Sequence, residues 1–361
     1  MVSLIKSIKA HSDKAWSVSA HKTVPLLATA STDKTSKIYK LSVKQNFPQV
    51  AQLEDTHKRS VRAVSFKPPL PGVESNFLDL PALASGSFDS TISIWGIDEP
   101  ETEILSSPRN EWNLMAIIEG HENEIKAVGW NHNGSLLASC SRDKTVWIWE
   151  TDPETLEEFE CISVLNDHQH DIKHVVWHPH QNLLASSSYD DTIRLYKQDL
   201  DDDDWSCVGV LNGHEGTVWC SQFEDNHRHQ ESNESSNRSK IRLVSVSDDM
   251  TARIWSKYIP SSIKHKSEMV WEQESILPPV HQYPIYSVAW SAQSGKIATV
   301  GSDGKIVIYI EGDDNSWSID SVKESAHGVH EINSIIWALL DDQSEVLVTA
   351  GDDGCVNIWK P

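Results

Sequence analysis

The sequence predicts an all-β chain that closes into a ring of seven four-stranded units, a seven-bladed β-propeller. A short frame that ends one strand, turns and begins the next recurs seven times along the 361 residues. A histidine precedes each copy, and 15 tryptophans with many Val and Ile residues favour strands, while no long apolar helical period occurs. Repeats of about 50 residues with four short strands are typical of propeller blades.

In every copy of the frame an aspartate precedes an aromatic residue by six positions. The copies read ASTDKTSKIY, SGSFDSTISIW, CSRDKTVWIW, SSSYDDTIRLY, VSDDMTARIW, VGSDGKIVIY and AGDDGCVNIW. The pairs are Asp33 and Tyr39, Asp89 and Trp95, Asp143 and Trp149, Asp190 and Tyr196, Asp249 and Trp255, Asp303 and Tyr309, and Asp353 and Trp359. Seven matches exceed chance, so the frame marks the same turn in every unit.

The recurring histidines are predicted to be structural partners of these aspartates. They are His11, His57, His121, His168, His214, His281 and His327. In the third unit we expect a buried His121 to donate to Asp143, supported by Ser139 and Trp149. Such contacts satisfy polar groups that would otherwise cost about 1 to 3 kcal/mol each when buried. A catalytic role for any of these pairs is therefore not expected.

The strand order within a unit also predicts how the ring closes. In the third unit we expect strands at 125–130, 136–141, 145–150 and 161–166, hydrogen-bonded in that order. The last unit ends at Trp359 with its third strand, so residues 2–9 are predicted to supply the fourth. Residues 1–361 would then form a single domain without exposed sheet edges at the chain ends.

The connections predict two different ends of the ring. We call the end with the histidine loops and aspartate turns the turn face, and the opposite end the insertion face. Long irregular stretches at 67–81, 97–113, 224–240 and 256–273 should all emerge on the insertion face. The Ser/Asn/Glu-rich stretch 224–240 is expected to be disordered. The acidic run 199–204 is expected to solvate a turn, with recognition of a basic partner as the alternative.

Composition excludes several classes of function. No apolar run approaches the roughly 20 residues needed to cross a bilayer, and the N-terminus lacks a signal-peptide core, so a soluble, intracellular, monomeric protein without membrane contact is expected. The five cysteines lack C-x-x-C spacing, which predicts free thiols and no bound cluster. A net charge of −22 argues against general nucleic-acid binding.

No enzyme, metal site or cofactor is predicted. The segment 167–180 holds five histidines, but the repeat places His168 and His178 at opposite ends of one strand. The sequence contains no G-x-x-x-x-G-K-[ST], H-E-x-x-H or G-x-S-x-G motif.

Two positions in each unit should point outward on the turn face, and these predict a partner-binding surface. The residue before each turn aspartate reads Thr32, Phe88, Arg142, Tyr189, Asp248, Ser302 and Asp352. The second residue of each first strand reads Trp16, Arg62, Lys126, Lys173, Trp219, Tyr286 and Asn333. Cations and aromatic residues anchor protein interfaces, and a guanidinium suits a carboxylate. We therefore predict partner binding by Arg142, Arg62, Lys126, Lys173, Phe88, Tyr189, Trp16, Trp219 and Tyr286; the alternative is that the cations only add solubility.

The repeat resembles the WD-repeat family over the whole chain. The segments SRDKTVWIWE, LNDHQHDIKHVVWHP, LLASSSYDDTIRLY, DDDDWSCVGVLNGHEGTVW and HSDKAWSVS closely resemble the WD-repeat subunit of the cytosolic iron-sulfur protein assembly machinery, and the loop 224–240 resembles fungal insertions. The resemblance implies a cytoplasmic and nuclear scaffold of the late targeting step. Its implied partners are a small SufT-like assembly factor, a large HEAT-repeat adaptor, a hydrogenase-like iron-sulfur protein and client apoproteins.

The family's functionally important arginine in the S-R-D-K turn corresponds to Arg142. Some clients in that family end in an aromatic residue with a free carboxylate, and we hypothesise that the cations of units 2 to 4 bind such a tail. The rival function is a substrate receptor of another complex, either a ubiquitin-ligase adaptor or a histone-tail reader.

Overall fold

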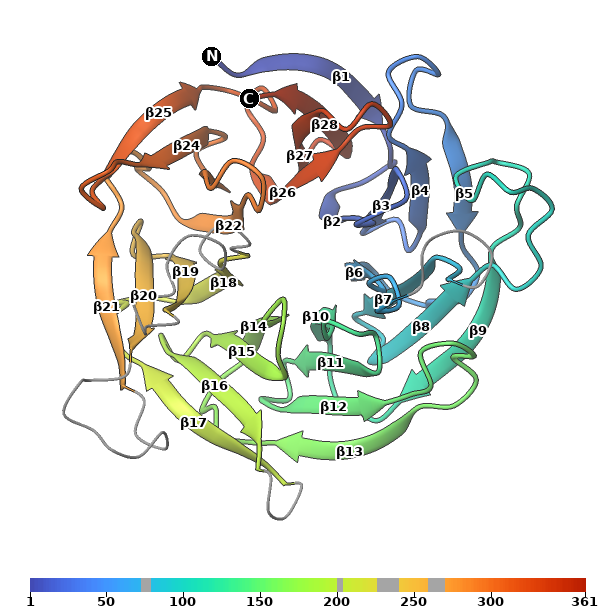
Figure 1. Cartoon of the computed structure of the whole chain (residues 1–361), viewed down its shortest axis with the longest axis horizontal. Helices are drawn as coiled ribbons and strands as arrows, with labels where there is room; N and C mark the ends of the chain where they lie inside the picture. The colour runs from blue at the N-terminus through green and yellow to red at the C-terminus, as the bar shows by residue number, and fades with distance from the viewer. Residues whose placement is uncertain (73–78, 200–203, 226–239, 259–269) are drawn as a thin grey trace.

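The computed structural model describes residues 1–361 except 73–78, 200–203, 226–239 and 259–269. The described residues form 28 strands and no helix. The strands assemble into seven four-stranded antiparallel sheets around one axis (Figure 1), so the predicted seven-bladed propeller is confirmed.

Each blade carries its strands in chain order from the axis outward. Blade 1 contains β2 (Ala15–Ala20), β3 (Leu26–Ser31), β4 (Ser36–Lys40) and β5 (Gln49–Leu53). Blade 2 contains β6 (Val61–Phe66), β7 (Ala82–Ser87), β8 (Thr91–Gly96) and β9 (Asn113–Glu119). Blade 3 contains β10 (Ile125–Trp130), β11 (Leu136–Ser141), β12 (Val146–Glu150) and β13 (Glu160–Leu165). Blade 4 contains β14 (Ile172–Trp177), β15 (Leu183–Ser188), β16 (Ile193–Gln198) and β17 (Trp205–Leu211).

The remaining blades follow the same plan, except that the last one borrows a strand. Blade 5 contains β18 (Val218–Phe223), β19 (Ile241–Ser247), β20 (Ala252–Tyr258) and β21 (Val270–Ile276). Blade 6 contains β22 (Ile285–Trp290), β23 (Ile297–Gly301), β24 (Ile306–Glu311) and β25 (Trp317–Lys323). Blade 7 contains β26 (Ile332–Leu339), β27 (Glu345–Gly351), β28 (Cys355–Lys360) and β1 (Ser3–Lys9).

The N-terminal strand closes the ring as predicted. β1 pairs antiparallel with β28, from Ser3 opposite Lys360 to Lys9 opposite Cys355. The two chain ends lie beside each other in this blade (Figure 1). The pairing covers an edge of β28 that would otherwise expose unpaired backbone groups.

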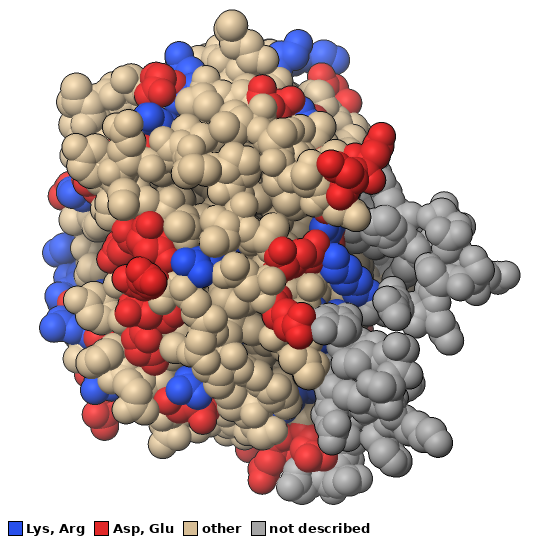
Figure 2. Space-filling view, turned by 90° about the vertical axis from the view of Figure 1, so that its left-hand side faces the viewer, with Lys and Arg blue, Asp and Glu red and all other residues tan. Residues whose placement is uncertain are grey.

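The core lies between neighbouring blades. The second strand of a blade is buried on both faces, as in β11, where all six residues are buried. Its side chains alternate between the two adjacent blades, which explains the near-continuous apolar and small sequence LLASCS. The outermost strands instead expose apolar side chains such as Ile117 of β9 and Val164 of β13. Figure 2 shows acidic and basic side chains interspersed with uncharged residues over one side of the ring's wall.

The predicted insertions fall between the expected strands, although residues 73–78, 226–239 and 259–269 lie outside the described part of the chain. The stretches 67–81 and 224–240 connect the first and second strands of blades 2 and 5, and 97–113 and 256–273 span the third and fourth strands of the same blades. Most of 224–240 and of the acidic run 199–204 lies outside the described residues.

Candidate functional site

The turn face is built on a repeated hydrogen-bond network, which we call the clamp: the histidine, the turn aspartate and a hydroxyl residue of the blade. In blade 3, His121 Nδ1 lies 2.7 Å from Asp143 Oδ2, and His121 Nε2 lies 2.8 Å from Ser139 Oγ. Trp149 Nε1 donates to the same hydroxyl at 3.0 Å. These contacts connect the loop before β10 to β11 and β12, as predicted.

The clamp also shifts the acidity of its aspartate. Burial alone would raise the pKa of Asp143, but hydrogen bonds from His121 and Thr145 hold the pKa at about 2. The pKa values of the other six turn aspartates are lowered in the same way. The carboxylates are therefore charged acceptors at neutral pH.

All seven histidines face their predicted aspartates, with nitrogen–oxygen distances of 2.7 to 3.3 Å. The hydroxyl partner comes from the second strand in six blades: Thr29, Ser139, Ser186, Ser245, Thr299 and Thr349. Blade 2 differs, because His57 Nε2 bonds Ser93 of β8 at 2.8 Å, while His57 Nδ1 lies 3.3 Å from Asp89 Oδ2.

The backbone around each turn aspartate holds the residue that precedes the aspartate in a fixed position. The residue following the aspartate has a left-handed backbone in every blade, with a φ of 73° at Lys144. The Arg142 amide donates to Glu124 O at 2.9 Å, which ties the turn to the loop before β10. The Arg142 side chain remains 56 % exposed. Among the residues that the structure describes, its guanidinium makes only long ion pairs, 3.9 Å to both Glu124 and Asp171, and so is available to a partner.

Three further predicted cations form what we call the throat: Arg62, Lys126 and Lys173, the second residues of β6, β10 and β14. They are half-buried and line the central channel. Burial lowers the pKa of Arg62 to about 10 and also lowers the pKa values of Lys126 and Lys173.

The predicted aromatic residues pack against the throat. Lys126 Nζ lies 4.2 Å from the Phe88 ring centre, and Arg62 Cζ lies 4.7 Å from that of Trp16. Lys173 Nζ lies 5.2 Å from the ring centres of both Tyr189 and Trp219. Such contacts hold a cation over an aromatic face without neutralising it.

Tyr286 completes the predicted set, since its ring meets that of Trp219 edge-on at 5.2 Å. Arg142 joins the others through Glu124 and Asp171, which also contact Lys126 and Lys173. The structure therefore brings all nine predicted residues together around one mouth of the channel.

Sequence reasoning missed three charged members of this surface. Arg59 donates to Glu124 at 2.8 Å and to Phe88 O at 2.8 Å. Glu124 also accepts from Lys126 at 2.8 Å, and Asp171 lies 3.6 Å from Lys173. The spacing of Glu124 to Lys126 and of Asp171 to Lys173 could have indicated the two carboxylates, because residues two apart on a strand point the same way.

The corresponding positions of blades 5 to 7 form closed polar pairs. Trp219 Nε1 donates to Asp248 at 2.5 Å, Ser302 Oγ to Glu331 at 2.7 Å, and Asn333 Nδ2 to Asp352 at 2.9 Å. Lys14 of blade 1 also pairs with Asp352 across the closing seam.

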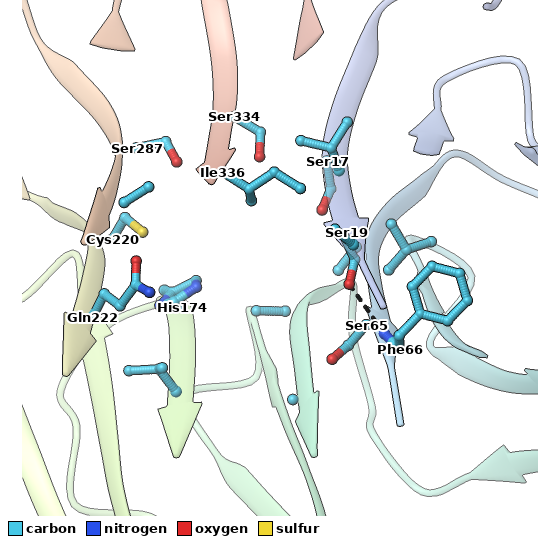
Figure 3. Close-up of a pocket in the computed structure, with 18 of the residues that line it drawn as sticks. Ser17, Ser19, Ser65, Phe66, His174, Cys220, Gln222, Ser287, Ser334 and Ile336 are labelled. Atoms are coloured by element: carbon cyan, nitrogen blue, oxygen red, sulfur yellow. Dashed lines mark hydrogen bonds between the residues drawn. The ribbon is translucent and has the colours of Figure 1, made fainter. Parts of the chain in front are cut away.

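The channel, which the throat residues help to line, has a volume of about 630 Å³ and a wall of mixed polar and apolar character. Figure 3 shows Ser17, Ser19, Ser65, Ser287 and Ser334 around it, with Gln222 and His174 opposite Ser19. His174 and Cys220 come from the neighbouring strands β14 and β18. Burial would raise the pKa of the Cys220 thiol, but His174 lowers it overall.

Within the described ranges, no three His, Cys, Asp or Glu side chains are placed to hold a metal ion. In the histidine-rich segment, His168 belongs to the clamp of blade 4, while His178 packs against Phe223 with ring centres 5.2 Å apart. All five cysteines are free thiols.

Comparison with known proteins identifies close relatives. Residues 2–40, 49–96, 112–150, 159–197, 205–256, 273–309 and 322–360 match the family model WD40, described as WD domain, G-beta repeat. The chain is 68 % identical to "Probable cytosolic iron-sulfur protein assembly protein 1" of Candida dubliniensis and 67 % identical to the protein of that name in Candida albicans, over 100 % of each chain. The same-named protein of Debaryomyces hansenii is 65 % identical, again over the full length of both chains.

Proposed function

The chain belongs to the WD40 repeat family and, within it, to the fungal proteins named cytosolic iron-sulfur protein assembly protein 1, and from this membership we propose that it is a non-enzymatic scaffold of cytosolic iron-sulfur protein assembly. The scaffold acts in the late step, in which clusters are delivered to cytosolic and nuclear apoproteins. Its partners are a small SufT-like factor, a large HEAT-repeat adaptor, a hydrogenase-like iron-sulfur protein and the clients themselves.

The observation that carries the scaffold role is the exposed Arg142 beside cations held on aromatic rings. An arginine that is 56 % exposed and only loosely paired contributes little to folding, yet it is a residue type that anchors interfaces. We assign partner binding to the nine residues around the channel mouth, with Arg142 as the anchor for a partner carboxylate. The clamp residues His121, Asp143, Ser139 and Trp149 are assigned a structural role.

Purification from cells separates this function from its rival. A tagged full-length chain should recover iron-sulfur assembly factors and client apoproteins, from both cytoplasmic and nuclear extracts. Recovery of ubiquitin-ligase subunits or of chromatin, without assembly factors, would identify the substrate-receptor function instead. The matched variants Arg142→Glu and Lys144→Glu make the same charge change in one turn. The site is supported if Arg142→Glu loses the assembly factors and Lys144→Glu retains them.

A further inference from the structure

The turn face of blades 2 to 4 carries a local excess of positive charge. Four cations, Arg59, Lys126, Arg142 and Lys173, share two carboxylates, Glu124 and Asp171, and a fifth, Arg62, pairs with neither. This leaves three positive charges unbalanced in a chain whose net charge is −22. The nearby turn aspartates stay charged, but their oxygens are held by the histidines, hydroxyl groups and backbone amides of the clamps. The carboxylates that counteract the lowered pKa values of Lys126 and Lys173 are Glu124 and Asp171.

The excess is concentrated at the throat. Glu124 pairs with Lys126 and Arg59, and Asp171 lies between Lys173 and Arg142. Among the described residues, Arg62 has no carboxylate partner, and its one hydrogen bond is a 3.4 Å contact with Trp16 O. A guanidinium carries five N–H donors, so most of those of Arg62 are unused.

The three throat cations lie within electrostatic range of one another. Beyond burial, the charge of Arg62 contributes to lowering the pKa values of both Lys126 and Lys173, and Lys126 has the same effect on Lys173. Holding three like charges together in a half-buried channel mouth is unfavourable unless an anion lies between them.

Size and shape narrow the class of anion. The channel volume of about 630 Å³ falls within the range of small-molecule sites. Donors arriving from three neighbouring blades match a tetrahedral oxyanion with several acceptor oxygens better than a planar carboxylate with two. A charge of minus two also comes closer to balancing the excess than a single carboxylate does.

We propose that Arg62, Lys126 and Lys173 bind a phosphate dianion at the throat, either as the free ion or as the head group of a small phosphate monoester. The site extends the proposed binding role of the turn face to a small ligand. Arg142, at the rim, remains the anchor for protein partners.

The test is calorimetric titration of the full chain with inorganic phosphate, glycerol 3-phosphate and succinate, at pH 8 and constant ionic strength. One saturable site for phosphate, glycerol 3-phosphate or both is expected, and the tighter of the two identifies the source. Arg62→Met should weaken this binding at least about tenfold, because it removes a charge-assisted contact. Arg109→Met, an exposed arginine of the β8–β9 connection, should leave binding unchanged.

The absence of a saturable site, equal binding by the two variants, or tighter binding of succinate would overturn the proposal. Lys173→Met replaces Arg62→Met if the latter lowers the melting temperature, and it should weaken phosphate binding as well. Recovery of assembly factors is measured on the same preparations. If the parent chain recovers the assembly factors but binds no phosphate, only the phosphate site has failed. If it binds phosphate but recovers no assembly factors, only the scaffold function has failed.

Discussion

The clamps and the residues around the channel mouth occupy adjacent positions in the same turns, yet they differ in kind. His–Asp pairs recur in all seven blades with nearly one geometry. Their immediate neighbours change from Arg142 in blade 3 to Tyr189 in blade 4 and Asp248 in blade 5. The repeated side chains connect the strands within each blade, and the varied ones contribute nothing to these repeated contacts.

The mouth residues divide further into two arcs. In blades 5 to 7 they pair with one another, as Asn333 does with Asp352. In blades 2 to 4 cations lie over aromatic rings, and Arg142 extends into solvent. Because the backbone positions are the same, only the side chains make the arc of blades 2 to 4 the charged part of the proposed surface, and Trp16, Trp219 and Tyr286 flank this arc. The following predictions test this division.

Acid should produce the largest effect, because it acts on all seven clamps at once. A carboxyl whose pKa is lowered in the folded state contributes stability above its unfolded pKa of about 4, and loses it as the pH falls through the folded value. Asp143 and Asp353 have pKa values of about 2, so stability should fall steeply between pH 4 and 2. His21 and His178, with pKa values lowered by burial to about 4, add an earlier loss between pH 6.5 and 4. Urea unfolding midpoints across pH 8 to 2 measure both losses, and a constant midpoint below pH 4 would contradict the clamp interpretation.

Breaking one clamp should have the next largest effect. Asp143→Ala leaves His121, Thr145 and the Glu122 amide without their acceptor and should lower the free energy of unfolding by about 2 to 4 kcal/mol. The control, Asp313→Ala, removes an exposed carboxylate of the β24–β25 connection. Equal urea midpoints for the two variants would show that the clamp is dispensable.

Reversing the charge of the neighbouring residue should change binding and leave folding intact. Arg142→Glu should keep the free energy of unfolding within about 0.5 kcal/mol of the parent, because the side chain is exposed. It should weaken binding of an assembly partner by about 1 to 3 kcal/mol. Titrations with a purified partner measure this, and Lys144→Glu serves as the control. Parent-like affinity of Arg142→Glu would remove Arg142 from the site.

The smallest effect is expected for the ion pair at the edge of this surface. Arg59 and Glu124 approach to 2.8 Å, but the arginine is 56 % exposed. A double-mutant cycle with Arg59→Ala and Glu124→Gln should give a coupling energy of about 0.2 to 1 kcal/mol. A coupling energy above about 2 kcal/mol would mean that the pair stabilises the fold as the clamps do.

The sequence predicted the parts of the fold that repeat. The histidine and aspartate spacing placed seven clamps, and the missing fourth strand after Trp359 placed β1. In blade 2, His57 bonds Ser93 of the third strand instead of a hydroxyl of the second strand. No sequence signal indicated this difference, because Ser85 occupies the usual position on the second strand. Which hydroxyl bonds His57 depends on side-chain rotamers and not on residue type.

The cluster of residues around the channel mouth was predicted in its members but not in its balance of charge. Strand alternation brought the cations and aromatic residues to one mouth, as their shared position in each blade required. Contacts between blades, such as Arg59 with Glu124 or Lys14 with Asp352, join residues from neighbouring repeats. Their pairing depends on how far long side chains reach across the blade interface, which no single repeat encodes.

The pairing of β1 with β28 sets an order on biosynthesis. The strand Ser3–Lys9 is synthesised before blades 1 to 6, and its hydrogen-bonding partner Cys355–Lys360 is synthesised after them. Blades 1 to 6 can assemble while translation proceeds, but the seventh is complete only once β28 has been synthesised. A polypeptide stalled before Cys355 would display two unpaired edges, on β1 and β27, which makes it a distinct target for chaperones and for ribosome-associated quality control.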